Sequence, residues 1–145
     1  MLLEFMGLQL PGVSFETPDS CLREPLTKSA TYQAIKMAEQ SILIGQLIDE
    51  RFVVNAMVGL QATRGSTNHT LHLLAIAAAA GISITWEDFS KLEQAVPLIA
   101  RVYPNGHADV NEYHKAGGIS FTIAVLPNTG LLHEEVTTIL GSAQC

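Results

Sequence analysis

The sequence has 145 residues, enough for one domain with a buried core, and 48% of them are hydrophobic, which excludes a disordered or low-complexity chain. The formal net charge is −6 and the eight Lys and Arg residues are spread along the chain, so we expect no nucleic-acid partner. The most apolar stretch, 71–80, has about half of the roughly 20 residues that a membrane span needs, and no basic leader begins the chain, so we expect a cytoplasmic protein without membrane association.

The first third of the chain is expected to hold a short helix, an irregular segment and a surface helix. Residues 2–6 resemble the last turns of a helix that Gly7 ends, and an irregular segment then runs from Pro11-Gly12 to about Arg23. Apolar residues at helical spacing over 25–39 predict an amphipathic surface helix. Because the first helix is already half finished at residue 1, we expect a part of the protein to be missing upstream of it.

Two apolar helices are expected in the middle of the chain, one directly after the other. The first begins at the capping residue Asp49, carries its apolar side chains on one face and ends near residues 61–65. Ser66 or Thr67 is the expected cap of the second helix. Because residues 71–80 leave almost no polar side, we expect this second helix to be buried.

Turn-forming residues divide the next part of the chain into short elements. The capping-box pattern Thr85-Trp86-Glu87-Asp88 predicts a helix that stops before Pro97. A strand over 98–102, a turn at Pro104-Asn105-Gly106 and a helix capped by Asp109 are expected to follow.

The C-terminal segment is the least regular in its pattern. Residues 119–126 are apolar enough for either a helix or a strand, and Pro127-Asn128-Thr129-Gly130 interrupts them before a weak closing element over 131–140. Helices dominate the expected elements, and no internal repeat or linker divides the chain. We therefore expect a mainly α chain that forms one unit, residues 1–145.

The segment between the two apolar helices is the main candidate for a binding site. Its backbone N–H groups would open the second helix, where unpaired donors and the positive end of the helix dipole favour an anion. A phosphate or a carboxylate is the expected ligand, and the alternative is an ordinary capped helix start without a ligand. The predicted substrate-binding residues are Arg64, Gly65, Ser66, Thr67 and Asn68.

The cysteines and histidines give no metal signature. Cys21 and Cys145 lie far apart with no Cys or His at ligand spacing, which argues against a zinc site or a disulfide framework. His69 and His72 share a helix face, but a metal site needs three or four ligands, so we expect a buried, hydrogen-bonded pair. His133-Glu134-Glu135 lacks the second His of a zinc-protease helix.

Four segments along the chain carry a family resemblance. In chain order they are Glu4-Phe5-Met6-Gly7-Leu8-Gln9-Leu10-Pro11-Gly12, Gly65-Ser66-Thr67-Asn68-His69-Thr70, Val102-Tyr103-Pro104-Asn105-Gly106 and Gly130-Leu131-Leu132-His133-Glu134. Together they resemble the dihydroxy-acid/phosphogluconate dehydratase family, and their order and spacing fit it over almost the whole chain. The His after Ser-Thr-Asn and the Tyr-Pro-Asn-Gly turn resemble the phosphogluconate branch and disfavour the sister dihydroxy-acid dehydratases.

The resemblance implies that the chain is an internal part of the larger α/β N-terminal domain of an enzyme several times longer. For that whole enzyme it implies dehydration of 6-phospho-D-gluconate to 2-dehydro-3-deoxy-6-phosphogluconate in the Entner–Doudoroff route, with a 4Fe-4S cluster and a divalent metal as cofactors. The family's cluster cysteines, metal-binding carboxylates and proposed serine base fall outside the stretch that this chain resembles. We therefore expect the chain to bind no cofactor and to be inactive alone, with a phosphorylated sugar acid as the substrate of the whole enzyme and homo-oligomers as its assembly.

Two positions depart from the family pattern. Arg64 stands where relatives usually carry Gly, which would strain the turn if the backbone there has a positive φ, although it also adds a cation. Pro127 and Asn128 interrupt what reads in relatives as a continuous helix. Two alternatives to a phosphogluconate dehydratase piece are a repurposed non-catalytic module that binds an anion or a protein partner, and a piece of a dihydroxy-acid dehydratase.

Overall fold

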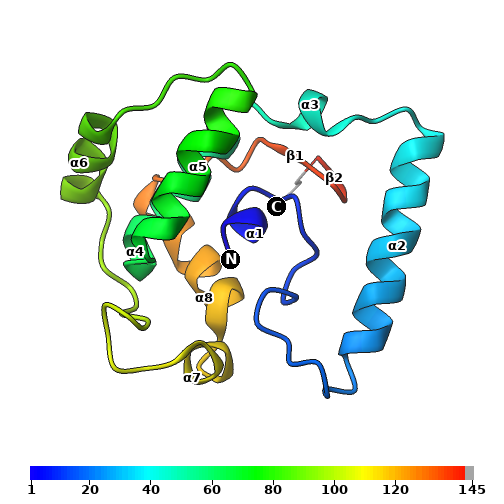
Figure 1. Ribbon diagram of the computed structural model, residues 1–145, viewed down its shortest axis with the longest axis horizontal. Coiled ribbons are helices and arrows are strands. Elements are labelled where there is room, and N and C mark those ends of the chain that lie inside the picture. Colours follow the sequence, from blue (N-terminus) through cyan, green and yellow to red (C-terminus); the bar gives the residue numbers. More distant parts are fainter. Residues whose placement is uncertain (143–145) are drawn as a thin grey trace.

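Helices make up nearly all of the regular structure, so the predicted mainly α class is confirmed (Figure 1). The computed structural model describes residues 1–142. No helix in this part of the chain is long and apolar enough to cross a membrane. The elements are α1 (Leu2–Phe5), α2 (Arg23–Glu39), α3 (Ile44–Leu47), α4 (Glu50–Thr63), α5 (Thr67–Ala79), α6 (Trp86–Ala95), α7 (Val110–Lys115), α8 (Gly118–Val125), the 3-10 turn η1 (Leu126–Thr129), and the strands β1 (Thr137–Thr138) and β2 (Gly141–Ser142).

Helix α4 lies at the centre of the fold and contacts α1, α5, α6 and α8. It begins where the Asp49 side chain accepts a hydrogen bond from the Phe52 N–H at 3.1 Å, as the capping pattern predicts. Two clusters of buried side chains meet on α4. One cluster includes Phe52 and Leu73, and the other includes Val58 and residues of α7 and α8. Because burial of apolar surface is the main favourable term in folding, α4 holds the two halves of the core together.

Two of the other predicted caps are confirmed by their hydrogen bonds. Helix α6 begins with a capping box in which Thr85 N–H donates to Asp88 at 2.8 Å and Asp88 N–H donates to the Thr85 hydroxyl at 3.3 Å. Helix α7 begins at Asp109, whose carboxylate accepts from the N–H groups of Asn111 and Glu112. Each cap satisfies backbone donors that the first turn of a helix leaves unpaired.

The first and last described segments of the chain meet in the middle of the molecule. Helix α1 lies at the centre of the view, close to the β1-β2 hairpin (Figure 1). The Ile139 N–H donates to the Gly7 carbonyl at 2.9 Å. The buried Glu4 carboxylate accepts from the N–H groups of Gly12 and of Ser14, the latter at 3.2 Å, which folds the loop after α1 back onto that helix.

Helix α2 is a surface helix, as predicted, and stands at the edge of the molecule (Figure 1). None of its residues is buried. Its links to the rest of the chain include a hydrogen bond from the Gln33 side chain to the Ile139 carbonyl and partial packing of Met37 against the core. Tyr32 is 80% exposed and Ile35 is 53% exposed, so this helix presents apolar side chains to solvent.

The prediction that the second apolar helix is buried is wrong. Only Leu73 and Ala77 of α5 are buried, and Leu71 is 52% exposed. The reason is geometric: α4 is the principal neighbour of α5 among the described residues, and one neighbouring helix can cover only one face. The apolar composition of α5 on all sides therefore did not predict how many neighbouring elements cover it.

The predicted strand over 98–102 is also wrong, and the open choice at 119–126 is resolved. The N–H groups of Ile99 and Ala100 both donate to the Ala62 carbonyl, at 2.8 and 3.0 Å, so this segment runs across the end of α4 instead of pairing with a strand. Only an isolated bridge joins Val102 to Ala108.

The apolar segment 119–126, for which the sequence left helix and strand open, is mostly helix α8. The predicted break after it is the turn η1, with Pro127 in its first positions.

Candidate anion site

The end of α4 and the start of α5 form a tight connection. Arg64 adopts the left-handed conformation, with φ 45° and ψ 50°, and its N–H donates to the Gln61 carbonyl at 3.2 Å. The Gly65 N–H donates to the Leu60 carbonyl at 3.1 Å. These bonds satisfy carbonyl groups that the last turn of a helix leaves free. Position 64, where relatives usually carry Gly, thus has a positive φ, and Arg64 adopts it at the cost of some backbone strain.

The start of α5 carries backbone donors for which residues 1–142 provide no acceptor. Ser66 is the N-cap by position, as predicted, but its side chain accepts no capping hydrogen bond. Within residues 1–142, no group accepts from the N–H groups of Ser66, Thr67 or Asn68, and Thr67 and Asn68 are exposed. Unpaired donors at the positive end of a helix dipole are suited to an anion.

A polar hollow lies beside this connection. It has a volume of about 300 Å³ and brings together the end of α4, one residue of α6 and the segment after it. Of the five predicted site residues, Arg64 and Gly65 line the hollow, whereas Ser66, Thr67 and Asn68 do not. The lining residues are Leu60, Gln61, Arg64, Gly65, Glu93, Arg101 and Asn105.

Hydrogen bonds from the 104–106 turn hold the hollow together. The Asn105 side chain donates to the Arg64 carbonyl at 2.7 Å and to the Gly65 carbonyl at 3.3 Å. Glycine is required at position 106, because a Cβ atom there would lie 2.0 Å from the carbonyl oxygen of Arg101. The turn predicted from the sequence is thus part of the wall that faces Arg64.

The hollow carries a local positive charge in a chain whose net charge is −6. Arg64 Nη2 lies 3.5 Å from Glu93 Oε1, and both side chains are about half exposed. Arg101 forms no ion pair with the described residues. Two guanidinium groups and one carboxylate leave a charge of +1, which favours an anionic ligand.

The expected buried, hydrogen-bonded histidine pair is not formed. His72 is exposed, and the buried Nδ1 atom of His69 has no hydrogen-bond partner. Burial lowers the pKa of His69, and the N-terminal ammonium and His72 lower it further, so His69 is neutral at pH 7. The pair is not buried together because α5 turns only the face with Leu73 and Ala77 toward α4.

The described residues do not fit a metal ion or an iron–sulfur cluster. In residues 1–142, no three His, Cys, Asp or Glu side chains gather as metal ligands. Cys21 is exposed, and Cys145 lies outside the described residues. A cluster needs several thiolates at one place, which these positions do not supply.

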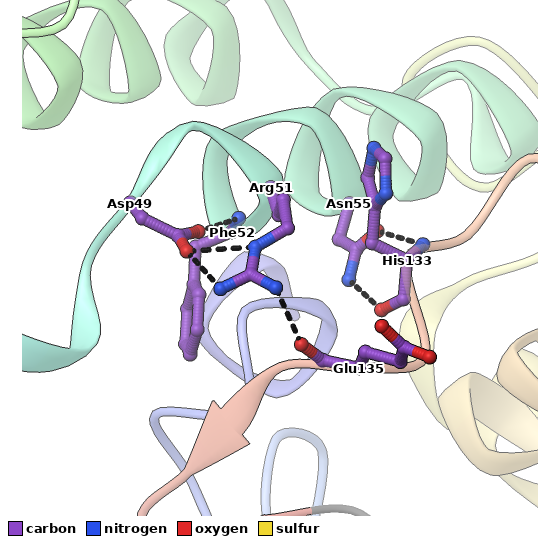
Figure 2. Close-up of polar contacts among 6 residues, drawn as sticks. All are labelled: Asp49, Arg51, Phe52, Asn55, His133 and Glu135. Atoms are coloured by element: carbon purple, nitrogen blue, oxygen red, sulfur yellow. Dashed lines mark hydrogen bonds and ion pairs between the residues drawn. The ribbon is translucent and has the colours of Figure 1, made fainter.

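Sequence reasoning missed a second polar arrangement, in which α4 holds the segment 133–135 (Figure 2). The buried Asn55 donates through Nδ2 to the His133 carbonyl at 2.9 Å and accepts at Oδ1 from the His133 N–H at 2.8 Å. Arg51 donates to the Glu135 carbonyl at 2.7 Å and to the Asp49 carboxylate. The sequence does offer one signal for this contact, because Asn55 stands among apolar residues on one face of the helix. A buried amide there needs hydrogen-bond partners from another segment.

These bonds use the backbone of the segment and leave its side chains free. The side chains of His133, Glu134 and Glu135 are exposed, and those of His133 and Glu135 take no part in the bonds to α4 (Figure 2). Burial would raise the pKa of Asp49, but hydrogen bonds from Arg51 and the Phe52 N–H outweigh burial and hold that pKa below its ordinary value. Asp49 is therefore ionised at neutral pH and pairs with Arg51.

Comparison with known proteins identifies the family. Residues 1–144 match the family model described as dihydroxy-acid/6-phosphogluconate dehydratase N-terminal. The chain is 54% identical to the phosphogluconate dehydratase of Rhizobium meliloti (strain 1021) and 51% identical to that of Pseudomonas aeruginosa, in both cases over 97% of this chain and 24% of the relative. The dihydroxy-acid dehydratase of Crocosphaera subtropica is 34% identical, over 95% of this chain and 25% of that protein. The chain spans about a quarter of the length of these relatives, and it belongs to the dihydroxy-acid/6-phosphogluconate dehydratase family.

Proposed function

We propose that this chain is part of a phosphogluconate dehydratase, which removes water from 6-phospho-D-gluconate to give 2-dehydro-3-deoxy-6-phosphogluconate in the Entner–Doudoroff route. The support is the difference in similarity between the two branches. Identity is 45% or more to proteins named phosphogluconate dehydratase and 34% to a dihydroxy-acid dehydratase. This difference favours the phosphogluconate branch over the sister activity.

The contribution we propose for this chain is to hold one anionic end of the substrate at residues 64–68. The observation that carries this proposal is the set of N–H groups of Ser66, Thr67 and Asn68, for which residues 1–142 provide no acceptor. A phosphorylated sugar acid has a carboxylate and a phosphate, and either can accept from backbone donors at a helix start. Arg64 adds a cation at the same connection.

The cofactors are assigned to the rest of the full-length enzyme. A 4Fe-4S cluster and a divalent metal are expected from the family resemblance, and the described residues fit neither. The chain is therefore proposed to form one structural unit of a larger domain and to be inactive when it is isolated. Its setting is proposed to be the cytoplasm.

Self-association is part of the proposal. Leu71 on α5, Tyr32 on α2 and Phe121 on α8 are more than half exposed. Exposed apolar surface of this kind is stabilised when another chain or another part of the same protein covers it. Homo-oligomers are the assembly we propose.

Two measurements test the proposed function. The isolated chain, incubated anaerobically with iron and sulfide, is expected to remain inactive towards 6-phosphogluconate. A stable brown protein that dehydrates 6-phosphogluconate would show that the chain is complete as an enzyme. In an NMR titration with 6-phosphogluconate, the amide signals of Ser66, Thr67 and Asn68 are expected to shift; if other amides shift and these do not, the segment is only a helix start.

A further inference from the structure

We propose that the hollow between the end of α4 and the 101–105 segment binds a phosphate monoester, with Arg64 and Arg101 as its two cationic contacts. The inference deepens the proposed function, on which it rests for the sugar-acid part of the ligand. It adds Arg101 to the site, in a hollow that Gln61 and Asn105 also line, and selects the phosphate over the carboxylate. Arg101 lies outside the segment 64–68 predicted from the sequence.

The charges of the hollow match a phosphate better than a carboxylate. A phosphate monoester carries a charge between −1.5 and −2 at pH 7, with three acceptor oxygens. Two guanidinium groups, from Arg64 and Arg101, line the same space of about 300 Å³. Arginine binds phosphate through paired N–H groups, so two arginines offer more donors than a single carboxylate can accept.

The backbone places both arginines before any ligand arrives. Asn105 donates to the carbonyl groups of Arg64 and Gly65, which fixes the turn against the end of α4. The close approach of Gly106 to the Arg101 carbonyl fixes the other side. Groups that are already in position bind a ligand with a smaller loss of conformational entropy.

The residue at position 64 is itself informative. Arg64 has a φ of 45°, a left-handed conformation that glycine adopts at lower cost. A long charged side chain stands there and lines the hollow. A strained backbone position that carries a charged side chain into a hollow is consistent with a binding role for that side chain.

Glu93 is a competitor for the ligand. Its carboxylate lies 3.5 Å from Arg64 Nη2, in an ion pair that is half exposed and therefore weak. A dianionic phosphate offers Arg64 more charge than Glu93 does, but Glu93 also repels it. Removal of the Glu93 charge should therefore strengthen phosphate binding, and removal of the Arg101 charge should weaken it.

The experiment is an NMR titration of this chain with inorganic phosphate at low salt, with gluconate and 6-phosphogluconate as comparison ligands. We expect phosphate to shift the side-chain signals of Arg64 and Arg101. Arg101→Gln should weaken binding about tenfold, Arg101→Lys should weaken it less, and Glu93→Gln should strengthen it about two- to threefold. The matched control is Arg23→Gln, which removes an exposed arginine of α2, on the opposite side of the molecule (Figure 1), and should leave binding unchanged.

Three outcomes decide the inference separately from the proposed function. Equal affinities of Arg101→Gln and Arg23→Gln would overturn the hollow as a phosphate site, as would equal binding of gluconate and phosphate. If phosphate binding does not depend on Arg101 while the signals of Ser66, Thr67 and Asn68 still shift with 6-phosphogluconate, the proposed substrate segment stands and this inference fails. Phosphate binding that depends on Arg101 supports the inference even if 6-phosphogluconate is not the substrate.

Discussion

The side-chain amide of Asn55 is hydrogen-bonded to both backbone polar groups of His133, 78 residues further along the chain. Asn55 is 4% exposed, whereas His133 is exposed, so these two bonds are partly buried. They match the two hydrogen bonds that a neighbouring strand would provide, although no strand is present there. The contact fixes the segment at His133 against α4 through the backbone of that segment, in addition to the core packing of Val136.

The first prediction concerns this contact. Asn55→Ala removes two partly buried hydrogen bonds to the His133 N–H and carbonyl, so it should lower the free energy of unfolding by about 1–3 kcal/mol. Urea unfolding at 25 °C measures the change. The control is Asn111→Ala on α7, an exposed side chain whose removal should change stability by less than about 0.5 kcal/mol. Equal effects of the two variants would contradict the structural role of Asn55.

The second prediction separates stability from binding at position 64. Arg64→Gly relieves a left-handed conformation and should raise the free energy of unfolding by about 1 kcal/mol, while it weakens phosphate binding. Ser41 is the other described non-glycine residue with a positive φ, at 55°. Ser41→Gly should therefore give a similar gain in stability and leave phosphate binding unchanged. Thermal unfolding and the phosphate titration, run on both variants, provide the comparison.

The third prediction concerns the dependence of stability on pH. Burial lowers the folded-state pKa of His69 below 6.5, so the unfolded chain binds a proton at a higher pH than the folded chain does. Stability from neutral His69 is present above about pH 7 and decreases as the pH falls through the unfolded pKa towards the folded one. His69→Gln should lose less stability between pH 7 and pH 5 than the unmodified chain. Identical pH profiles of urea unfolding would rule this out.

The fourth prediction concerns association. Leu71 lies on the uncovered side of α5 and is 52% exposed, so the chain should sediment as dimers or larger species at micromolar concentrations. Leu71→Gln should shift the equilibrium towards the monomer. The control is Leu43→Gln, which changes another exposed leucine, near α3, and should have a smaller effect. A single monomeric species at all concentrations tested would mean that the exposed apolar face of α5 does not drive association.

Local signals predicted much of the fold. Asp49, Thr85 and Asp109 begin helices as expected, because a cap depends on residues only three positions away. The burial of α5 was not predictable in the same way, since it depends on how many elements lie beside the helix and not on the helix's own composition.

The candidate site shows the same limit. The segment 64–68 could be singled out because it joins two apolar helices, and the resemblance identified the 102–106 turn. The two segments are in contact through a hydrogen bond from the Asn105 side chain to the Arg64 carbonyl. These residues lie 41 positions apart, and a local sequence pattern cannot predict a contact over that separation. The hollow and the role proposed for Arg101 therefore became visible only in three dimensions.

The contact between Gly7 and Ile139 has a consequence for the order in which the chain folds. While the chain is being synthesised, α1 emerges before the hairpin that lies against it, and the Ile139–Gly7 contact can form only after the residues between them have been made. Contacts between residues so distant in sequence require a large loss of chain entropy and slow the search for the native state. Helix α4 can cover the apolar side chains of α1 earlier, but until the hairpin is made the part of α1 and its loop that the hairpin contacts stays uncovered on the nascent chain, where a chaperone can bind it.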